Sequence, residues 1–213
     1  MRIACIYSVD DYETAEQPLA NSSEIPFGIS MIATVLKEAG HAVDLFVICP
    51  ATNVGRVMQN YISENHPEMF CLSAVSSQFL VVEKVAQIVK EIDPSIYVVL
   101  GGHHASLAPD EAIRSPFLDA LCVGEGDSAV LKLATQLESG DGEPSGIPNM
   151  WIKRPEEIEQ TPALPFNQDL DDLPYVDRSL WQPWIVAPQE EVSVLAGRGC
   201  PYKCTYYSNH AME

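Results

Sequence analysis

The stretch EMFCLSAVSSQFLVVEKVAQIVKEIDPSIYVVLGG (68–102) decides the fold. It holds an apolar run, a polar turn, a segment of helical period, and a second apolar run that ends in two glycines. A strand, a crossover helix and a second strand in this order form a parallel pair with a right-handed connection. Both apolar runs lack alternation, which is typical of strands that helices cover on both faces.

The same unit repeats on either side of this stretch. Further strands are predicted at 2–8, 41–48 and 118–124, and further helices at 25–40, 53–65, 108–115 and 127–139. Asn53 is a plausible N-cap, and Gly40 is a natural helix stop. We therefore predict that residues 1–140 form an α/β domain, a doubly wound, flavodoxin-like (Rossmann-like) five-stranded parallel sheet.

The composition changes after that domain. GDGEPSGIPN (140–149) is rich in turn residues, and residues 141–190 are rich in proline and lack a long periodic segment. We predict a strand near residue 150, then an irregular connector. A last strand is predicted at EVSVLAGRG (191–199), directly before Cys200.

The charge is strongly acidic, with 12 Lys+Arg against 30 Asp+Glu and a net charge of −18. Such a surface repels phosphate backbones and anionic lipid, so we expect no nucleic-acid partner and no membrane partner. No apolar run is long enough to span a bilayer, and MRIACIYSVDDYE (1–13) turns acidic too early for a signal peptide. We therefore expect a cytoplasmic protein whose Cys5, Cys71 and Cys122 are buried and unpaired.

Small and polar residues gather where the predicted strands end. Ligands of an open parallel sheet bind beyond the carboxyl ends of its strands, where glycine permits close approach and serine offers a hydroxyl. Some of these glycines are equally explained by tight turns before helices. The predicted cofactor-binding residues at this edge are Ser73, Val75, Ser76, Ser77, Gln78, Gly101, Gly102, His103, Gly124, Glu125 and Gly126.

Other nucleotide-binding patterns fit poorly. No GxGxxG follows the first strand, no GKS or GKT occurs, and Glu125 would repel a phosphate in the GEG turn before the helix at 127–139. A flavodoxin-like electron carrier needs a phosphate loop after the first strand, but residues 8–24 are acidic there. A receiver-like domain needs an aspartate to phosphorylate, and the third strand ends in Ser73 instead.

The order of features resembles the N-terminal cobalamin-binding domain of the cobalamin-dependent radical S-adenosylmethionine enzymes. The resemblance covers the whole chain and rests on PFGISMIATVLKEAGHAVDLF (26–46), LSAVSSQ (72–78), VVLGGHHASLAPDEAI (98–113), LDALCVGEGD (118–127), DLDDLPYVDRSLW (169–181) and GRGCPYKCTY (197–206). It implies cobalamin as the small-molecule cofactor, held by the strand-end residues above. The parent enzyme it implies is a methyltransferase that acts on an unactivated carbon or phosphorus atom, or an enzyme of radical rearrangement.

The spacing of sequence motifs tests whether the chain carries a histidine that would ligate cobalt on the lower face of the corrin. Methionine-synthase-like domains carry DxHxxG about 41 residues before SxL, and SxL about 26 to 28 residues before GG. Here Ser73-Ala74-Val75 stands for SxL, and 25 residues (76–100) precede Gly101-Gly102. Counting back places the histidine motif at PFGISM (26–31), where Gly28 replaces the histidine. We expect Phe27 and Gly28 to pack near the lower corrin face, and His103 and His104 to lie near the corrin or its nucleotide tail without ligating cobalt, while His41 is a loop histidine.

The cysteine motif is incomplete. Radical S-adenosylmethionine enzymes bind three irons of a four-iron cluster through CxxxCxxC. Cys200 and Cys204 match the first two ligands, Tyr206 fits the aromatic position, and Tyr207 stands at the third cysteine. We read 191–213 as the start of a truncated radical domain, because a barrel needs on the order of 200 residues and six follow Tyr207.

This departure limits what the chain can do alone. The four-iron four-sulfur cluster and S-adenosylmethionine are expected in the full-length parent only, with Cys200 and Cys204 as unligated thiols here and no catalytic residue in this fragment. The alternative function is a cobalamin-free domain of the same shape, which serves substrate recognition or assembly in such an enzyme. The missing histidine motif is compatible with both readings.

Overall fold

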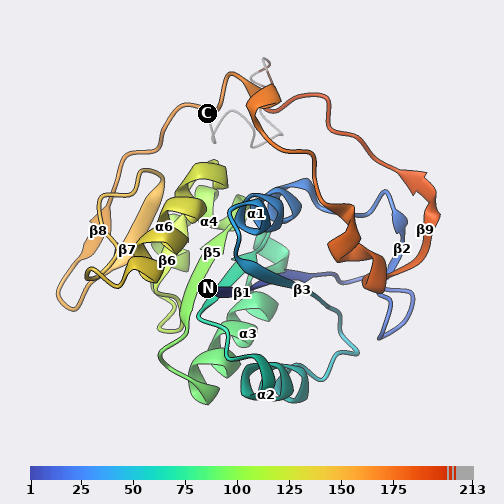
Figure 1. Cartoon of the computed structure of the whole chain (residues 1–213), viewed down its shortest axis with the longest axis horizontal. Helices are drawn as coiled ribbons and strands as arrows, with labels where there is room; N and C mark the ends of the chain where they lie inside the picture. The colour runs from blue at the N-terminus through green and yellow to red at the C-terminus, as the bar shows by residue number, and fades with distance from the viewer. Residues whose placement is uncertain (201, 203, 205–213) are drawn as a thin grey trace.

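A seven-stranded sheet forms the centre of the computed structural model, which describes residues 1–200, 202 and 204 (Figure 1). Its order is β3-β1-β4-β5-β6-β7-β8. The parallel strands are β1 (Arg2–Ser8), β3 (Ala42–Ile48), β4 (Met69–Ser73), β5 (Tyr97–Gly101) and β6 (Ala120–Cys122). They lie where strands were predicted, and the α/β class with a mostly parallel sheet is confirmed.

The predicted count of five strands is too low, because two antiparallel strands extend the sheet beyond β6. They are β7 (Met150–Lys153) and β8 (Ile158–Gln160). Only a short turn joins them, so they pair as a hairpin without a crossover. The proline-rich region contains ordered sheet because Met150 and Ile152 face the core while Trp151 and Lys153 are only half-buried.

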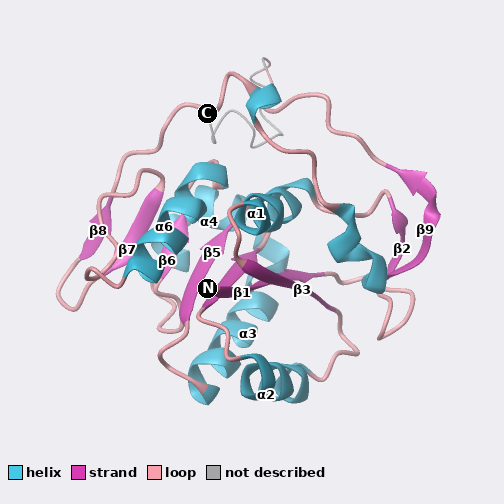
Figure 2. Cartoon of the chain, viewed as in Figure 1, coloured by secondary structure: helices cyan, strands magenta, loops and turns pink. Residues whose placement is uncertain are grey.

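Helices cover both faces of the sheet, as Figure 2 shows. Helices α1 (Phe27–Glu38) and α6 (Asp127–Ser139) pack into one apolar cluster, and α2 (Val54–Asn65) and α3 (Phe79–Ile92) pack into the other. The apolar face of α1 follows from Ile29, Ala33 and Leu36, which recur at helical spacing and are buried. The predicted cap is present, since the Asn53 side chain accepts a hydrogen bond from the Arg56 N–H.

The region after β5 differs from the prediction. The glycine-histidine segment was expected to be a loop, but it contains α4 (His103–Leu107). The helix predicted at 108–115 is shorter, because α5 comprises only Pro109–Ala112. Pro109 begins the new helix, since it has no N–H to continue the hydrogen bonds of α4.

The connector crosses the sheet end and returns to the N-terminal region (Figure 1). It contains the 3-10 helices η2 (Leu170–Asp172) and η3 (Arg178–Trp184). A parallel pair then forms between β2 (Leu19–Ser22) and β9 (Ile185–Val192). The strand predicted at 191–199 is therefore wrong, because the partner β2 aligns Leu19 with Ile185 and only Val192 of the predicted range pairs.

Within residues 1–200, 202 and 204, no helix combines the length and the apolar character that a membrane crossing requires.

Candidate functional site

A crevice is expected where the strand order reverses. In chain order the parallel strands run 2-1-3-4-5, so successive connections leave β1 and β4 in opposite directions. Ligands of doubly wound sheets bind at this switch point, beyond the carboxyl ends of the strands. Ser8 ends β1 and Ser73 ends β4. The hydroxyl of Ser8 is buried and has no hydrogen-bond partner among the described residues.

Gln78 spans this switch point. Its Nε2 donates to the Ser8 carbonyl at 2.7 Å, and its Oε1 accepts from the Val75 N–H at 3.1 Å. Gln78 is itself buried, whereas Val75, Ser76 and Ser77 are exposed. The structure therefore gives Gln78 the task of shaping the β4 loop and leaves the two serines facing outward.

The glycine pair joins the β4 and β5 loops. Gly102 has φ +89°, and a Cβ there would lie 2.9 Å from both the Ala74 carbonyl oxygen and Ser73 Oγ. Only glycine fits such a backbone at so close an approach. The His104 N–H donates to the Ala74 carbonyl at 3.0 Å, so the two loops form one surface.

The two neighbouring histidines separate. His103 is exposed at the start of α4, at the ligand edge. His104 is 3% exposed, stacks on Phe79 with ring centroids 4.1 Å apart, and brings Nδ1 to 3.2 Å from Ser76 Oγ. Both histidines lie in α4 rather than in a loop at 101–106, and their place near the corrin or its nucleotide tail stays a prediction. His41, expected to be an ordinary loop histidine, is buried.

The first turn of α1 presents open space. A Cβ at Gly28 would meet no atom within 4 Å, and Phe27 is half-buried beside it. Because a helix that covers a parallel sheet runs antiparallel to the strands, this first turn lies at the ligand end. Gly28 thus leaves open surface at the first turn of α1.

The β6–α6 loop closes the other side of the site. Gly124 has φ +91° with open space at its Cβ position, and its N–H donates to Ser106 Oγ at 3.0 Å. Gly126 is tightly packed, since a Cβ there would lie 2.9 Å from Ile32 Cδ1. Gly124 therefore faces the open edge, and Gly126 allows α6 to approach α1.

The Glu125 carboxylate is bound by Arg198 and by the connector. Arg198 Nη1 lies 2.8 Å from Glu125 Oε1 and 2.5 Å from Asp127 Oδ2. The Asn167 N–H donates to the other Glu125 oxygen at 2.6 Å. Burial lowers the pKa of Arg198, but hydrogen bonds to Asp127 and Glu125 outweigh it and the pKa rises overall. The predicted repulsion of anions by Glu125 is weakened by this pairing.

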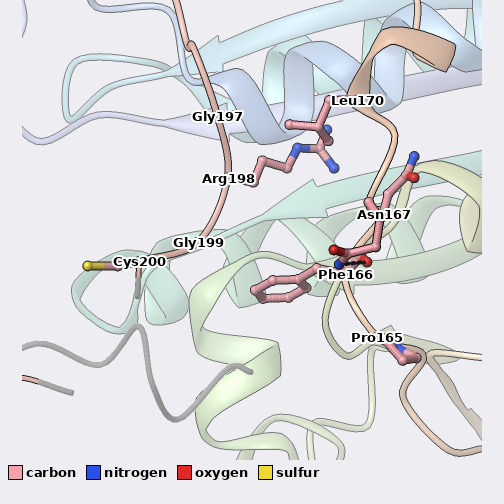
Figure 3. Close-up of a pocket in the computed structure, with 9 residues that line it drawn as sticks. Pro165, Phe166, Asn167, Leu170, Gly197, Arg198, Gly199 and Cys200 are labelled. Carbon is pink, nitrogen blue, oxygen red and sulfur yellow. Dashed lines mark hydrogen bonds between the residues drawn. The ribbon is translucent and has the colours of Figure 1, made fainter. Parts of the chain in front are cut away.

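A cavity of about 520 Å³ lies beside this contact, between the connector and residues 197–200 (Figure 3). Its lining includes Phe166, Asn167, Leu170, Arg198 and Cys200. None of the predicted cofactor residues lines this cavity. Arg198 both lines the cavity and pairs with Glu125 at the strand-end edge. The strand ends form an open edge, which suits a broad flat ligand better than an enclosed one.

The cysteines in the strands are structural. Cys5, Cys71 and Cys122 are free and buried, and so is Cys49, which directly follows β3. Burial raises the pKa of the Cys122 thiol to about 12, and a hydrogen bond with Cys5, together with burial, raises the pKa of Cys71. Such thiols are inert.

No metal site is assembled by the described part of the chain, which contains no group of three or more His, Cys, Asp or Glu suited to a metal ion. Cys200 and Cys204 are half-buried. Tyr206 and Tyr207 lie outside the described residues, so the three-position motif stays a prediction.

Sequence reasoning missed the residues that tie the site to the connector. These are Ser106, Asn149, Asn167 and Arg198. One signal was available for Arg198, which is the only basic residue between Ser179 and Cys200. The others carry no distinctive pattern.

Comparison with known proteins gives a family match and several relatives. The model of the B12-binding domain matches residues 20–134. The anaerobic magnesium-protoporphyrin IX monomethyl ester cyclase of Rubrivivax gelatinosus is 26% identical over 191 residues, which cover 86% of this chain and 34% of that protein. The cobalamin-dependent radical SAM methyltransferase TokK of Streptomyces tokunonensis is 29% identical over 147 residues, which cover 66% of this chain and 22% of that protein.

A solved structure shares the fold. It is that of the radical S-adenosylmethionine methyltransferase TsrM from Kitasatospora setae, with tryptophan substrate and a SAM analog bound. The TM-score is 0.62 at 15% identity, covering 76% of this chain and 30% of that one. The chain thus spans about a third or less of the length of these proteins.

Proposed function

Because this chain belongs to the B12-binding domain family, we propose that it is the cobalamin-holding module of a larger radical S-adenosylmethionine methyltransferase. One observation carries the proposal: the family match at 20–134 contains every predicted cofactor residue, and the fold brings these residues to one edge. The names of relatives such as the methyltransferase TokK support the reaction of the parent. Since those proteins extend well beyond the matched region, the reaction itself belongs to the parent.

The edge suits a corrin in shape and chemistry. Gly28 and Gly124 leave open surface on either side of the switch point. Ser76 and Ser77 are exposed. The Ser77 hydroxyl can donate to the amide oxygens and phosphate of cobalamin, whereas Ser76 Oγ also lies 3.2 Å from His104 Nδ1. The buried Ser8 hydroxyl, which has no partner among the described residues, lies at the end of β1.

The residues of this chain would have distinct tasks. Gln78 and Gly102 hold the two loops in place, and Phe27 gives the lower face an apolar neighbour. When bound, cobalamin supplies the methyl group for the parent's reaction. Because Gly28 replaces the histidine, α1 offers no imidazole to the cobalt at that position, and the exposed His103 is the first residue of α4.

The rest of the chain completes the proposal. We assign residues 1–140 to the cobalamin-binding domain, 141–190 to the connector and 191–213 to the start of the radical domain. In the parent, Cys200 and Cys204 would ligate the iron–sulfur cluster that binds S-adenosylmethionine, and the barrel would be this module's neighbour. The acidic surface and the thiols favour the cytoplasm.

The test is a titration of the purified chain with hydroxocobalamin and methylcobalamin, followed by desalting and a visible spectrum. We expect near-stoichiometric retention of the corrin with shifted bands. Gly28→Phe fills the open surface of α1 and should weaken binding about tenfold or more, which is about 1.4 kcal/mol. His103→Ala should leave the corrin bands unchanged, since it does not ligate cobalt.

Gly55→Phe is the matched control. Gly55 is also the second residue of a 12-residue helix, is exposed, and meets only Asn53 Oδ1 at 3.8 Å. Gly55 stands on α2, outside the predicted site, and the Gly55→Phe variant should bind cobalamin like the unsubstituted chain. If both corrins wash out of the unsubstituted 213-residue chain and of a longer chain that includes the barrel, the cobalamin-free alternative is correct.

A further inference from the structure

A charged contact joins the cysteine segment to the β6–α6 loop. Arg198 Nη1 meets Glu125 Oε1 at 2.8 Å and Asp127 Oδ2 at 2.5 Å, and Nη2 lies 3.4 Å from Asp127 Oδ1. Arg198 is two residues before Cys200, whereas Glu125 precedes α6 and Asp127 is its first residue. The contact therefore links the candidate cluster ligand to the candidate corrin loop across more than 70 residues of sequence.

Glu125 also fixes the connector. Its second carboxylate oxygen accepts the Asn167 N–H at 2.6 Å, and its carbonyl accepts Asn149 Nδ2 at 2.7 Å. Asn149 Oδ1 in turn accepts the Leu164 N–H at 2.5 Å. The loop, the connector and the cysteine segment thus meet at a single side chain.

Burial separates this contact from an ordinary surface ion pair. The side-chain exposures are 22% for Arg198, 18% for Glu125 and 13% for Asp127. Isolated exposed pairs contribute little, but a partly buried guanidinium with several charged acceptors has its geometry fixed. Figure 3 shows the Arg198 side chain reaching from its segment toward Leu170 and Asn167, while the Cys200 sulfur points to the opposite side. The segment is therefore anchored by one side and presents the cysteine on the other.

We propose that Arg198 is a positioning residue, which clamps the cysteine segment onto the β6–α6 loop and so sets the orientation of the cysteine motif over the corrin edge. The proposal rests on the proposed function for its purpose, but the clamp itself is a property of this chain. One arginine held by two carboxylates fixes the direction in which the segment leaves the domain. The loop that would contact the corrin and the segment that would hold the cluster then move as one body.

The test measures the position of the segment directly in the full 213-residue chain. Spin labels are attached at Ala196→Cys and Lys132→Cys, both exposed, in a Cys200→Ser, Cys204→Ser background, because the other cysteines are buried. We expect a single narrow distance distribution. Arg198→Gln, and Glu125→Gln combined with Asp127→Asn, should each lose the narrow peak.

Arg114→Gln is the control, because Arg114 is exposed two residues after α5 and the same charge is removed. It should keep the narrow peak. A peak that stays narrow in Arg198→Gln would overturn the clamp. Hydroxocobalamin titration of the unsubstituted chain and of a longer chain that includes the barrel separates the two proposals: loss of corrin binding in both opposes the proposed function, whereas the distances alone decide the clamp.

Discussion

Residues at the proposed ligand edge, beyond the carboxyl ends of the strands, have two distinct roles. Gly102 and Gln78 hold loops together and are enclosed, whereas Gly28, Ser76 and Ser77 face outward. A sequence pattern treats all of them alike, because both groups are small or polar residues at strand ends or at the start of a helix. Substitutions should separate them by their effects on stability and on binding.

Gly102→Ala should destabilise the fold by about 1–3 kcal/mol, because the residue has φ +89° and the new Cβ would press on the Ala74 carbonyl oxygen. Urea unfolding followed by circular dichroism measures the change. Gly55→Ala is the control, since it adds a methyl group to an exposed helical glycine with open surroundings, and should be neutral or stabilise by up to about 1 kcal/mol. Equal stability of the two variants would contradict the role given to Gly102.

At the scale of elements, the connector is fastened to α1. Thr34 Oγ1 accepts the Asp177 N–H at 2.9 Å, and Lys37 Nζ lies 2.5 Å from Asp177 Oδ2. Asp177 also caps η3 by accepting the Ser179 N–H at 2.9 Å. The connector is therefore held by specific contacts over α1, even though it has no long regular element.

The charge of Asp177 gives this attachment a pH dependence. Lys37, and then Ser179, hydrogen-bond the carboxylate and hold the pKa of Asp177 below its usual value. A lowered carboxyl pKa stabilises the fold above the unfolded-state pKa of about 3.9, and the contribution is lost as the pH falls through the lowered pKa. Asp177→Asn should therefore cost up to about 1 kcal/mol at pH 7, and this difference should vanish in strong acid.

The measurement is urea unfolding of both proteins at a series of pH values from neutral to acidic. Asparagine keeps the capping oxygen, so the difference isolates the charge. Asp169→Asn serves as the control, because Asp169 caps η2 by accepting the Asp171 N–H and stands away from Lys37. A stability difference for Asp177→Asn that stays constant with pH would show that the Lys37 pair does not cause it.

At the scale of the whole molecule, the connector belongs to the core. Trp181 of η3 is 0% exposed and lies in the same apolar cluster as Ile3, Ile29 and Ile185. Its ring meets Tyr7 edge-on with centroids 6.0 Å apart. Because a connector residue fills the core of the sheet domain, we expect the sheet and residues 178–192 to unfold together.

Trp181→Ala should cost about 3–5 kcal/mol, through lost apolar burial and the cavity left behind. Trp184→Ala is the matched control, since that ring is only half-buried against Phe46 at 6.0 Å and should cost less. Tryptophan fluorescence and far-ultraviolet circular dichroism should give coincident unfolding transitions in the unsubstituted chain. Separate transitions would show that the connector is an independent appendage.

The sequence by itself determined the parallel sheet, its helices and the edge where small residues gather. Those features depend on neighbours in the chain, since the alternation of apolar runs with helical periods and the glycines at strand ends are local patterns. The β7–β8 hairpin was only half visible, because strands of four and three residues carry little period. Tertiary structure alone decided that Trp181 fills the core and that Arg198 meets Glu125, 73 residues away. Such contacts depend on how distant segments meet when the chain closes on itself, and no local pattern records that.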